Sequence, residues 1–262
     1  MMKCKVCGGP SEKNFEAQIL QRYSAKYYLC ADCGFLQSET PHWLPEANRD
    51  PLNTCDTGVL SRNLYLSRLT SVVLYFLYGK KARCLDYSGG YGILTRMMRD
   101  IGFDSYWCDP NAENIFARGF EYRDSIGDID LVTCFEAYEH FVEPIVEIEK
   151  ILKISRNILF TTVLLPDPVP DPDNWWYYGF PHGQHISFYS IRSLRHIAKT
   201  FNLDFHTNGV NIHMFSERSI HPWQLWIFLF LNRIGFPIFI RLLMKSRTME
   251  DMDILSTSRG AS

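Results

Sequence analysis

The sequence lacks several features that mark broad classes of protein. No run of five or six Lys and Arg occurs in its 262 residues, and the formal net charge is only -2. A nucleic-acid binder usually concentrates basic residues, so the composition predicts no nucleic-acid partner and favours a small or neutral one. The N-terminal MMKCKVCGG has no apolar h-region, which argues against a secretory signal. With eight Cys and no export signal, we expect a reducing, cytoplasmic location.

Four of the cysteines have metal-ligand spacing. Cys4 and Cys7 form one CxxC pair, and Cys30 and Cys33 form a second pair after 22 further residues. A Gly follows each pair, where a positive φ lets backbone N–H groups point at the thiolates. The pattern predicts one closed, tetrahedral four-cysteine Zn²⁺ site with a structural role, in preference to catalysis or redox chemistry.

The remaining pattern predicts an α/β domain. Residues 59–78 carry apolar positions at helical spacing, and strands then alternate with helices, which indicates a doubly wound, mostly parallel sheet. The sheet is expected to end in an antiparallel hairpin, because LDFHT and VNIHMFS are joined by Asn208-Gly209, a preferred two-residue turn. The predicted strands are KARCLDY, DSYWCD, DLVTCF and RNILFTTVLL, and the predicted helices include ILTRMMRDIG, NAENIFARGF, PIVEIEKILK and IRSLRHIAKTF.

The first of these strands ends in CLDYSGGYG, a stretch rich in Ser and Gly. A P-loop is excluded because GK[ST] is absent, and a dinucleotide fingerprint would have Gly where Thr95 stands. Asp86, ahead of the loop, can meet an ammonium group, while the loop backbone and the next helix N-terminus meet a carboxylate. Asp109 closes the second strand, where a carboxylate can accept hydrogen bonds from both hydroxyls of a ribose. An amino acid joined to a ribose indicates S-adenosylmethionine.

The segments LDYSGGYG, WCDP and IDLVTCFEAYEHFVEPIVEIEKILK resemble the class I S-adenosylmethionine-dependent methyltransferases, over roughly residues 80–216. The resemblance implies a seven-stranded Rossmann-like sheet whose last strand is antiparallel. Ser88 stands where that family usually has Gly, so we expect its backbone to keep a negative φ or to be strained. The resemblance places the third strand at EYRDSIGDID, so that DLVTCF is the fourth strand and RNILFTTVLL the fifth. This third-strand region is short and contains no acid recognisable as adenine-binding. The cofactor-binding residues implied are Asp86, Ser88, Gly89, Gly90, Gly92, Asp109, Pro110, Phe135 and Glu136.

The cysteine pattern narrows the resemblance. A Cys4 knuckle ahead of such a domain, with PHGQHISFYS after the fifth strand, looks like the sugar C-methyltransferases and their shorter relatives, although their long C-terminal domain is lacking. We therefore expect C- or O-methylation of a small-molecule acceptor, with a sugar or nucleotide-linked sugar as one option. The alternatives are a nucleic-acid methyltransferase with a zinc reader and a non-catalytic module that binds S-adenosylmethionine.

The stretch NWWYYGFPHGQHISFYS contains the candidate catalytic residues, because ligands bind at this edge of an open α/β sheet. His185 and His182 are candidate bases, since imidazole titrates near neutral pH. The alternative for His185 is a hydrogen bond to backbone at the end of the loop. Trp175, Trp176, Tyr177 and Tyr178 are predicted either to form a wall for the apolar face of a sugar or an aromatic acceptor, or equally well to pack against the zinc module. Glu139 and His140 follow the fourth strand, and for His140 a structural role at the start of the next helix is favoured.

The C-terminal stretch HPWQLWIFLFLNRIGFPIFIRLLMK is strongly apolar but interrupted. Because Asn232, Arg233, Gly235 and Pro237 divide it, neither piece reaches the ~20 residues that span a bilayer. Two short amphipathic helices are predicted, and packing against the domain or a second subunit is favoured over peripheral membrane contact through 222–247. The oligomeric state stays open. The expected parts are a zinc module (1–40), a connector with the N-terminal helix (41–80), the methyltransferase domain (81–218) and the C-terminal helical extension (219–262).

Overall fold

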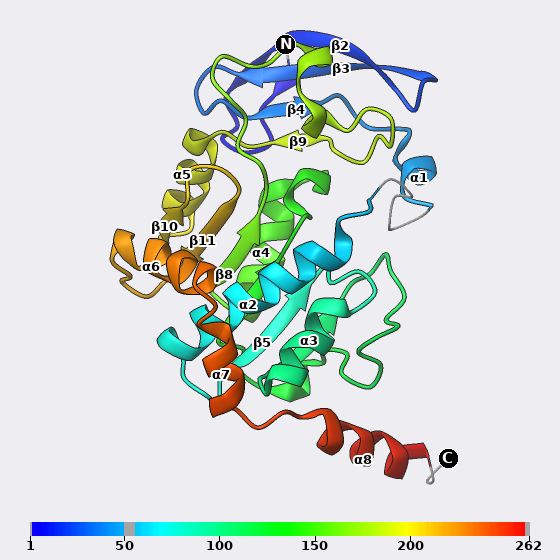
Figure 1. Ribbon diagram of the computed structural model, residues 1–262. Helices are drawn as coiled ribbons and strands as arrows, with labels where there is room; N and C mark the ends of the chain where they lie inside the picture. The colour runs from blue at the N-terminus through cyan, green and yellow to red at the C-terminus, as the bar shows by residue number, and fades with distance from the viewer. Residues whose placement is uncertain (1, 50–55, 260–262) are drawn as a thin grey trace. The chain divides into compact units, whose positions relative to one another are not determined.

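The computed structural model describes residues 2–49 and 56–259, and Figure 1 shows its elements. Residues 50–55 of the expected connector lie outside the described part of the chain. The chain forms two compact units. Unit 1 comprises residues 1–53 and 134–220, and unit 2 comprises residues 54–133 and 221–262. This division groups the N-terminal residues with residues 134–220.

Unit 1 contains a five-stranded antiparallel sheet in the order β1-β2-β3-β4-β9. The turn between β2 and β3 has positive φ at Leu20 and Gln21, 53° and 56°, the combination that a type I′ hairpin turn requires. The last strand comes from the distant stretch that contains the candidate histidines, so the N-terminal sheet is not built from N-terminal residues alone. Its strands are β1 (Met2–Lys3), β2 (Pro10–Ile19), β3 (Tyr23–Cys30), β4 (Leu36–Ser38) and β9 (Ser187–Phe188).

The terminal hairpin of the α/β sheet also belongs to unit 1. Its two strands are antiparallel, as predicted, and β11 is also antiparallel to β8. The predicted two-residue turn is wrong, because the N–H of Asn208 bonds the carbonyl of Ile212 and closes a longer loop. The side-chain oxygen of Asn208 accepts the N–H groups of residues 210–212, which stabilises this wider turn. The elements here are α1 (Leu44–Ala47), α4 (Pro144–Ile154), β8 (Ile158–Thr161), α5 (Ile191–Thr200), β10 (Asp204–Thr207) and β11 (Ile212–Ser216).

Unit 2 contains the parallel part of that sheet, in which β5 pairs with both β6 and β7. The strand order is β10-β11-β8-β7-β5-β6, so six strands form in the described residues and not the expected seven. The helix predicted near 111–120 is absent, and a single parallel bridge between Trp107 and Glu121 stands where a further edge strand was expected. Asn114 explains the loop locally, because its side chain bonds the Ala117 N–H and the Glu121 carboxylate. The elements are α2 (Val59–Leu77), β5 (Arg83–Tyr87), α3 (Ile93–Ile101), β6 (Asp104–Cys108), a 3₁₀ turn (Asp124–Ile126) and β7 (Leu131–Cys134).

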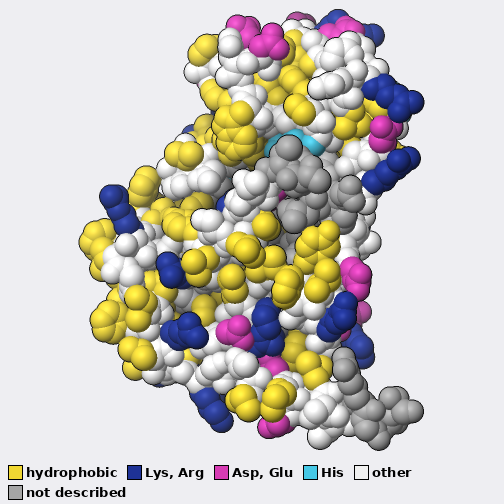
Figure 2. Space-filling model, turned by 45° about the vertical axis from the view of Figure 1, so that its right-hand side comes forward, with side chains coloured by type: hydrophobic (Ala, Val, Ile, Leu, Met, Phe, Trp, Pro, Cys, Tyr) yellow, Lys and Arg dark blue, Asp and Glu magenta, His cyan; other side chains and the backbone are white. Residues whose placement is uncertain are grey.

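The C-terminal extension forms three helices, one more than predicted: α6 (Pro222–Arg233), α7 (Pro237–Leu243) and α8 (Thr248–Arg259). Phe76 of α2 contacts Phe228 and Phe236, with ring centroids 6.2 and 5.6 Å apart. Other apolar side chains of α6 and α7 are exposed, among them Trp226 and Phe230. In Figure 2, hydrophobic side chains reach the surface with Lys and Arg scattered among them. Among the described residues no single helix meets the length and hydropathy of a membrane span, and α6 with α7 does so only as a pair bent by 83°.

Candidate functional site

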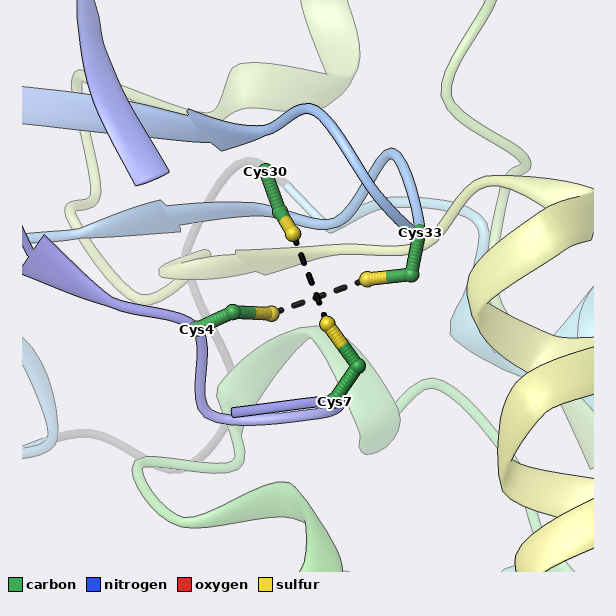
Figure 3. Close-up of side chains that lie close together, drawn as sticks. All are labelled: Cys4, Cys7, Cys30 and Cys33. Carbon is green, nitrogen blue, oxygen red and sulfur yellow. Dashed lines mark hydrogen bonds between the residues drawn. The ribbon is translucent and has the colours of Figure 1, made fainter. Parts of the chain in front are cut away.

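The four predicted zinc ligands lie together in unit 1. Figure 3 shows the side chains of Cys4, Cys7, Cys30 and Cys33 pointing toward one centre from two turns. The sulfur atoms of Cys4 and Cys33 are 3.6 Å apart and those of Cys7 and Cys30 are 3.5 Å apart. A tetrahedral Zn²⁺ with bonds of about 2.3 Å requires sulfur atoms roughly 3.8 Å apart, so the set fits this ion. The predicted positive φ is confirmed at the Gly after each pair, at 77° and 70°.

The glycine-rich loop of unit 2 connects β5 to α3 and is held against β6. Ser88 has φ of 58°, so the strained alternative is the one observed, at a cost of roughly 1–2 kcal/mol for a residue with a Cβ. The Ser88 N–H donates to the Cys108 carbonyl at 2.8 Å. The Trp107 indole N–H donates to the Gly90 carbonyl, also at 2.8 Å. These two hydrogen bonds hold the loop backbone against β6.

Asp86 lies beneath this loop and is buried. Its carboxylate accepts hydrogen bonds from the hydroxyls of Thr133 at 3.1 Å and Thr95 at 3.4 Å. Burial, together with the negative charge of Asp109, raises the pKa of Asp86 to about 7. A Cβ added at Gly89 would lie 2.6 Å from the Asp86 carboxylate, so only Gly lets the loop pass this closely. Burial therefore disfavours the ionised form of Asp86, and a nearby cation would stabilise that form.

Asp109 lies at the end of β6, on the other side of the loop. One of its oxygens accepts the Gly90 N–H at 2.9 Å, and the other accepts the Asn111 N–H at 2.8 Å. A carboxylate has about four acceptor sites, so two remain for a bound hydroxyl pair. Pro110 follows Asp109 and is exposed, and Gly92 begins α3 with a φ of 83°. Unit 2 thus brings together the loop and both predicted carboxylates.

Phe135 and Glu136, the other two residues of the implied cofactor site, belong to unit 1. Both are partly buried. Glu136 has φ of 52°, its N–H donates to the Thr161 hydroxyl oxygen at 2.8 Å, and the Thr161 hydroxyl donates to its carboxylate at 2.7 Å. This exchange turns the Glu136 carboxylate toward β8.

A second polar cluster in unit 1 consists of Glu139, His140 and His185. The carboxylate and imidazole atoms that could bind a ligand lie within 4.8 Å of one another. Burial, and then the charge of Glu136, raise the pKa of Glu139 to about 8. Burial lowers the pKa of His140 to about 4 and that of His185 well below its usual value. Both imidazoles are therefore neutral near pH 7, with lone pairs available.

Both predicted histidines lie at this cluster. The Nδ1 of His185 is 2.6 Å from the Tyr177 carbonyl oxygen. A carbonyl can only accept, so Nδ1 carries the proton and Nε2 keeps a free lone pair. The His182 ring centroid is 4.7 Å from that of His185, and its Nδ1 accepts the Gln184 N–H at 3.2 Å. A Cβ at Gly179 would lie 2.2 Å from His182 Nε2, so Gly is needed there.

A backbone hydrogen bond brings these distant residues together. The Ile186 N–H donates to the Glu139 carbonyl at 2.8 Å, which places the neighbouring His185 beside Glu139. In the next strand, Phe188 pairs with Leu36 of β4, only three residues after Cys33. Sequence reasoning did not identify Glu139 as the centre of a cluster, and it favoured a purely structural role for His140. No local spacing could have shown that residue 185 returns to this point.

The aromatic residues before the histidines mostly pack in the core. Tyr177 and Tyr178 are buried in a cluster that includes Tyr27, Trp43 and Phe188. Packing against the N-terminal sheet, the alternative to an acceptor-binding wall, is therefore what these two tyrosines do.

Comparison with known proteins gives one family. A family model described as a methyltransferase domain matches residues 61–208. Solved structures similar to this chain include magnesium protoporphyrin IX methyltransferase from Synechocystis PCC 6803 with SAH, at 10% identity and a TM-score of 0.41, covering 66% of this chain and 93% of that one. An O-methyltransferase family protein from Burkholderia thailandensis has 14% identity, a TM-score of 0.44 and 68% coverage of both chains. Human N-acetylserotonin methyltransferase with SAM has 13% identity, a TM-score of 0.41, and coverage of 68% and 66%.

A search of curated proteins finds no significant match to the sequence. The methyltransferase-domain match, however, spans more than half of the 262 residues. The chain therefore belongs to the methyltransferase-domain family and is an enzyme of that class.

Proposed function

We propose that the enzyme transfers a methyl group from S-adenosylmethionine to a small polar acceptor. The observation that carries this proposal is the arrangement in unit 2, where a narrow glycine-rich loop lies between Asp86 and Asp109. Ligands of open α/β sheets bind at the C-terminal ends of the strands, where both carboxylates are. Asp86 is assigned to the ammonium group of the cofactor, and Asp109 to its ribose hydroxyls.

Calorimetric titration with S-adenosylmethionine tests the cofactor assignment. An Asp109→Ala variant should bind the cofactor about 10–100-fold more weakly, because hydrogen bonds to a charged group are each worth about 1.5–3 kcal/mol. Asp128→Ala, at an exposed Asp of the same unit, is the matched control and should bind normally. Absence of binding to the native protein at millimolar cofactor, or an undiminished affinity in Asp109→Ala, would contradict the proposal.

The Glu139–His140–His185 cluster is proposed to act on the acceptor. Methyl transfer is an in-line displacement at a sulfonium, so positioning supplies much of the rate, and a base is needed only when the acceptor loses a proton. His185 is neutral and has a free Nε2, which suits removal of a proton from a hydroxyl or an acidic C–H. A sugar or nucleotide-linked sugar is the proposed acceptor class, supported by the sequence resemblance of the cysteine pairs and of PHGQHISFYS.

Steady-state kinetics on acceptors found with a labelled methyl donor tests this role. His185→Ala should lower turnover by about 10²–10⁴-fold, the usual contribution of a positioned base, while cofactor affinity stays unchanged. His42→Ala, at an exposed His of the same unit, should leave both quantities unaltered. Unchanged turnover in His185→Ala would remove this residue from the reaction.

We also infer that the four cysteines bind a structural Zn²⁺. The ion would fix the turn that ends at Cys33, and the Cys33 carbonyl accepts the Ser190 hydroxyl at 2.7 Å just beyond β9. Because β9 begins two residues after His185, the cysteine cluster supports the position of the proposed base. Cys30→Ser should remove one zinc per chain by elemental analysis, lower the melting temperature and reduce turnover more than cofactor affinity. Full zinc content in this variant would contradict the assignment.

A further inference from the structure

The Glu139 side chain is fully buried. Its residue has no exposed surface, and neither carboxylate oxygen has a hydrogen-bond partner among the described residues. The hydroxyls of Tyr177 and Thr162 act to lower the pKa of Glu139, less strongly than burial raises it, and they are 3.3 Å from each other. An ionised carboxylate in such surroundings is costly unless a cation or several donors accompany it. The fold therefore leaves this group available to a cationic ligand.

The two imidazoles complete a recognisable donor set. The ring centroids of His140 and His185 are 5.1 Å apart. The His185 Nδ1–H donates to the Tyr177 carbonyl, which fixes the tautomer and directs the free Nε2 away from that carbonyl. Histidines that bind metals almost always donate their other ring N–H to a carbonyl or carboxylate in this way.

We propose that Glu139, His140 and His185 bind a divalent first-row transition-metal ion, separate from the ion of the four cysteines. One carboxylate and two neutral imidazoles suit Zn²⁺, Fe²⁺ or Mn²⁺, and three protein ligands leave positions open for a substrate oxygen. The ligand atoms are close enough, within 4.8 Å, for small side-chain rotations to bring them around one ion. The ion would also neutralise the buried Glu139 charge.

The consequence for catalysis rests on the proposed function, whereas the metal binding does not. With an ion bound, His185 would serve as a ligand, and the cation would lower the pKa of an acceptor hydroxyl bound to it. The O–H bond breaks and its proton passes to water. The oxygen then bonds the methyl carbon as the C–S bond breaks, which leaves a neutral thioether. Loss of His185 should therefore lower turnover whether this residue acts as a base or as a metal ligand.

Metal analysis of the full chain tests the proposal. After dialysis against Zn²⁺, the native protein should hold two equivalents, and Glu139→Gln and His185→Gln should each hold one. The exposed-residue variant His42→Gln should keep both. In a separate experiment, native protein is loaded with a single equivalent of Zn²⁺ and then titrated with Co²⁺. The bound Co²⁺ should show ligand-field bands and no thiolate charge-transfer absorption. Glu139→Gln, prepared in the same way, should bind Co²⁺ at least about 100-fold more weakly.

Two results would overturn the proposal. One is a native protein that takes up a single equivalent with the thiolate signature only, which would leave Glu139 as a protonated carboxylic acid. The other is a second equivalent that persists in both ligand variants. Titration of the same samples with S-adenosylmethionine separates this failure from failure of the proposed function, because the carboxylates assigned to the cofactor lie in unit 2 and are unchanged.

Discussion

Two buried carboxylates, one in each unit, have opposite surroundings. Asp251 of α8 accepts hydrogen bonds from Arg99 at 2.6 and 2.8 Å and from Arg96 at 2.8 Å. The Arg99 guanidinium also lies over the Phe120 ring, 3.6 Å from its centroid. Glu139 has no such partner among the described residues.

We interpret Asp251 as a structural carboxylate and Glu139 as a carboxyl group available to a ligand. Burial alone would raise the pKa of Asp251, but its hydrogen bonds with Arg99 hold it below the usual value. For Glu139, burial dominates and the pKa rises. A saturated ion pair contributes to the fold only as long as both partners stay, whereas a buried carboxyl group without an ionic partner opposes folding until a cation binds to it. Substitutions at the two positions should therefore change stability in opposite directions.

Breaking the saturated pair should have the largest effect. Asp251→Ala leaves two arginines facing a space that was filled by a carboxylate, and should lower the free energy of unfolding by about 3–5 kcal/mol. Urea unfolding followed by circular dichroism measures this loss. Asp253→Ala, at an exposed Asp of the same helix, should change it by less than about 0.5 kcal/mol. A loss below about 1 kcal/mol in Asp251→Ala would show that the pair is not structural.

Removing the unpartnered carboxyl group of Glu139 should change the free energy of unfolding in the opposite direction. In protein depleted of the second metal, Glu139→Gln should keep the free energy of unfolding unchanged or raise it by about 1–3 kcal/mol. Because the pKa of Glu139 is raised to about 8, its carboxyl group must take up a proton on folding at pH 7, whereas Gln needs none. The same urea experiment measures it, with exposed Glu149→Gln as the control. Destabilisation as large as that of Asp251→Ala would show that the Glu139 carboxyl group is structural, as that of Asp251 is.

Asp86 is an intermediate case, since only hydroxyls accompany it. Its raised pKa of about 7 means that the protonated form persists up to neutral pH, and a protonated acid does not attract an ammonium group. Affinity for S-adenosylmethionine should thus be present above pH 7 and fall about tenfold as the pH is lowered to 6. Calorimetry across this range measures the change. In Asp86→Asn the affinity should be low and nearly independent of pH, and a pH dependence equal to that of the native protein would assign the titration to another group.

The smallest effect concerns strain in the backbone. Ser88 holds a positive φ beside the proposed cofactor site. Ser88→Gly should raise the free energy of unfolding by about 1 kcal/mol, because Gly adopts this conformation without a Cβ penalty. Ser88→Ala keeps the penalty and should show no gain. Equal stability of the Gly and Ala variants would mean that the loop relaxes around Ser88.

Elements that depend on neighbours along the chain were predictable. The apolar spacing of 59–78 predicted α2, and the alternation after residue 81 predicted β5, α3 and β6 nearly to their ends. The helix predicted at 111–120 failed because Asn114 bonds its own neighbourhood and stabilises a loop, an interaction that apolar spacing does not reveal. The two-residue turn at Asn208-Gly209 failed for a similar reason, since the Asn208 side chain supports a wider loop.

The sequence by itself determined the four-cysteine set and the glycine-rich loop with its flanking acids, because each depends on spacings of a few residues within one turn or between adjacent strands. Only the tertiary structure decided that His185 lies beside Glu139 and that Asp251 pairs with Arg99. These partners are 46 and 152 residues apart. A backbone hydrogen bond between distant segments and an ion pair between two helices bring them together, and those contacts depend on the path of the whole backbone, which no local periodicity records.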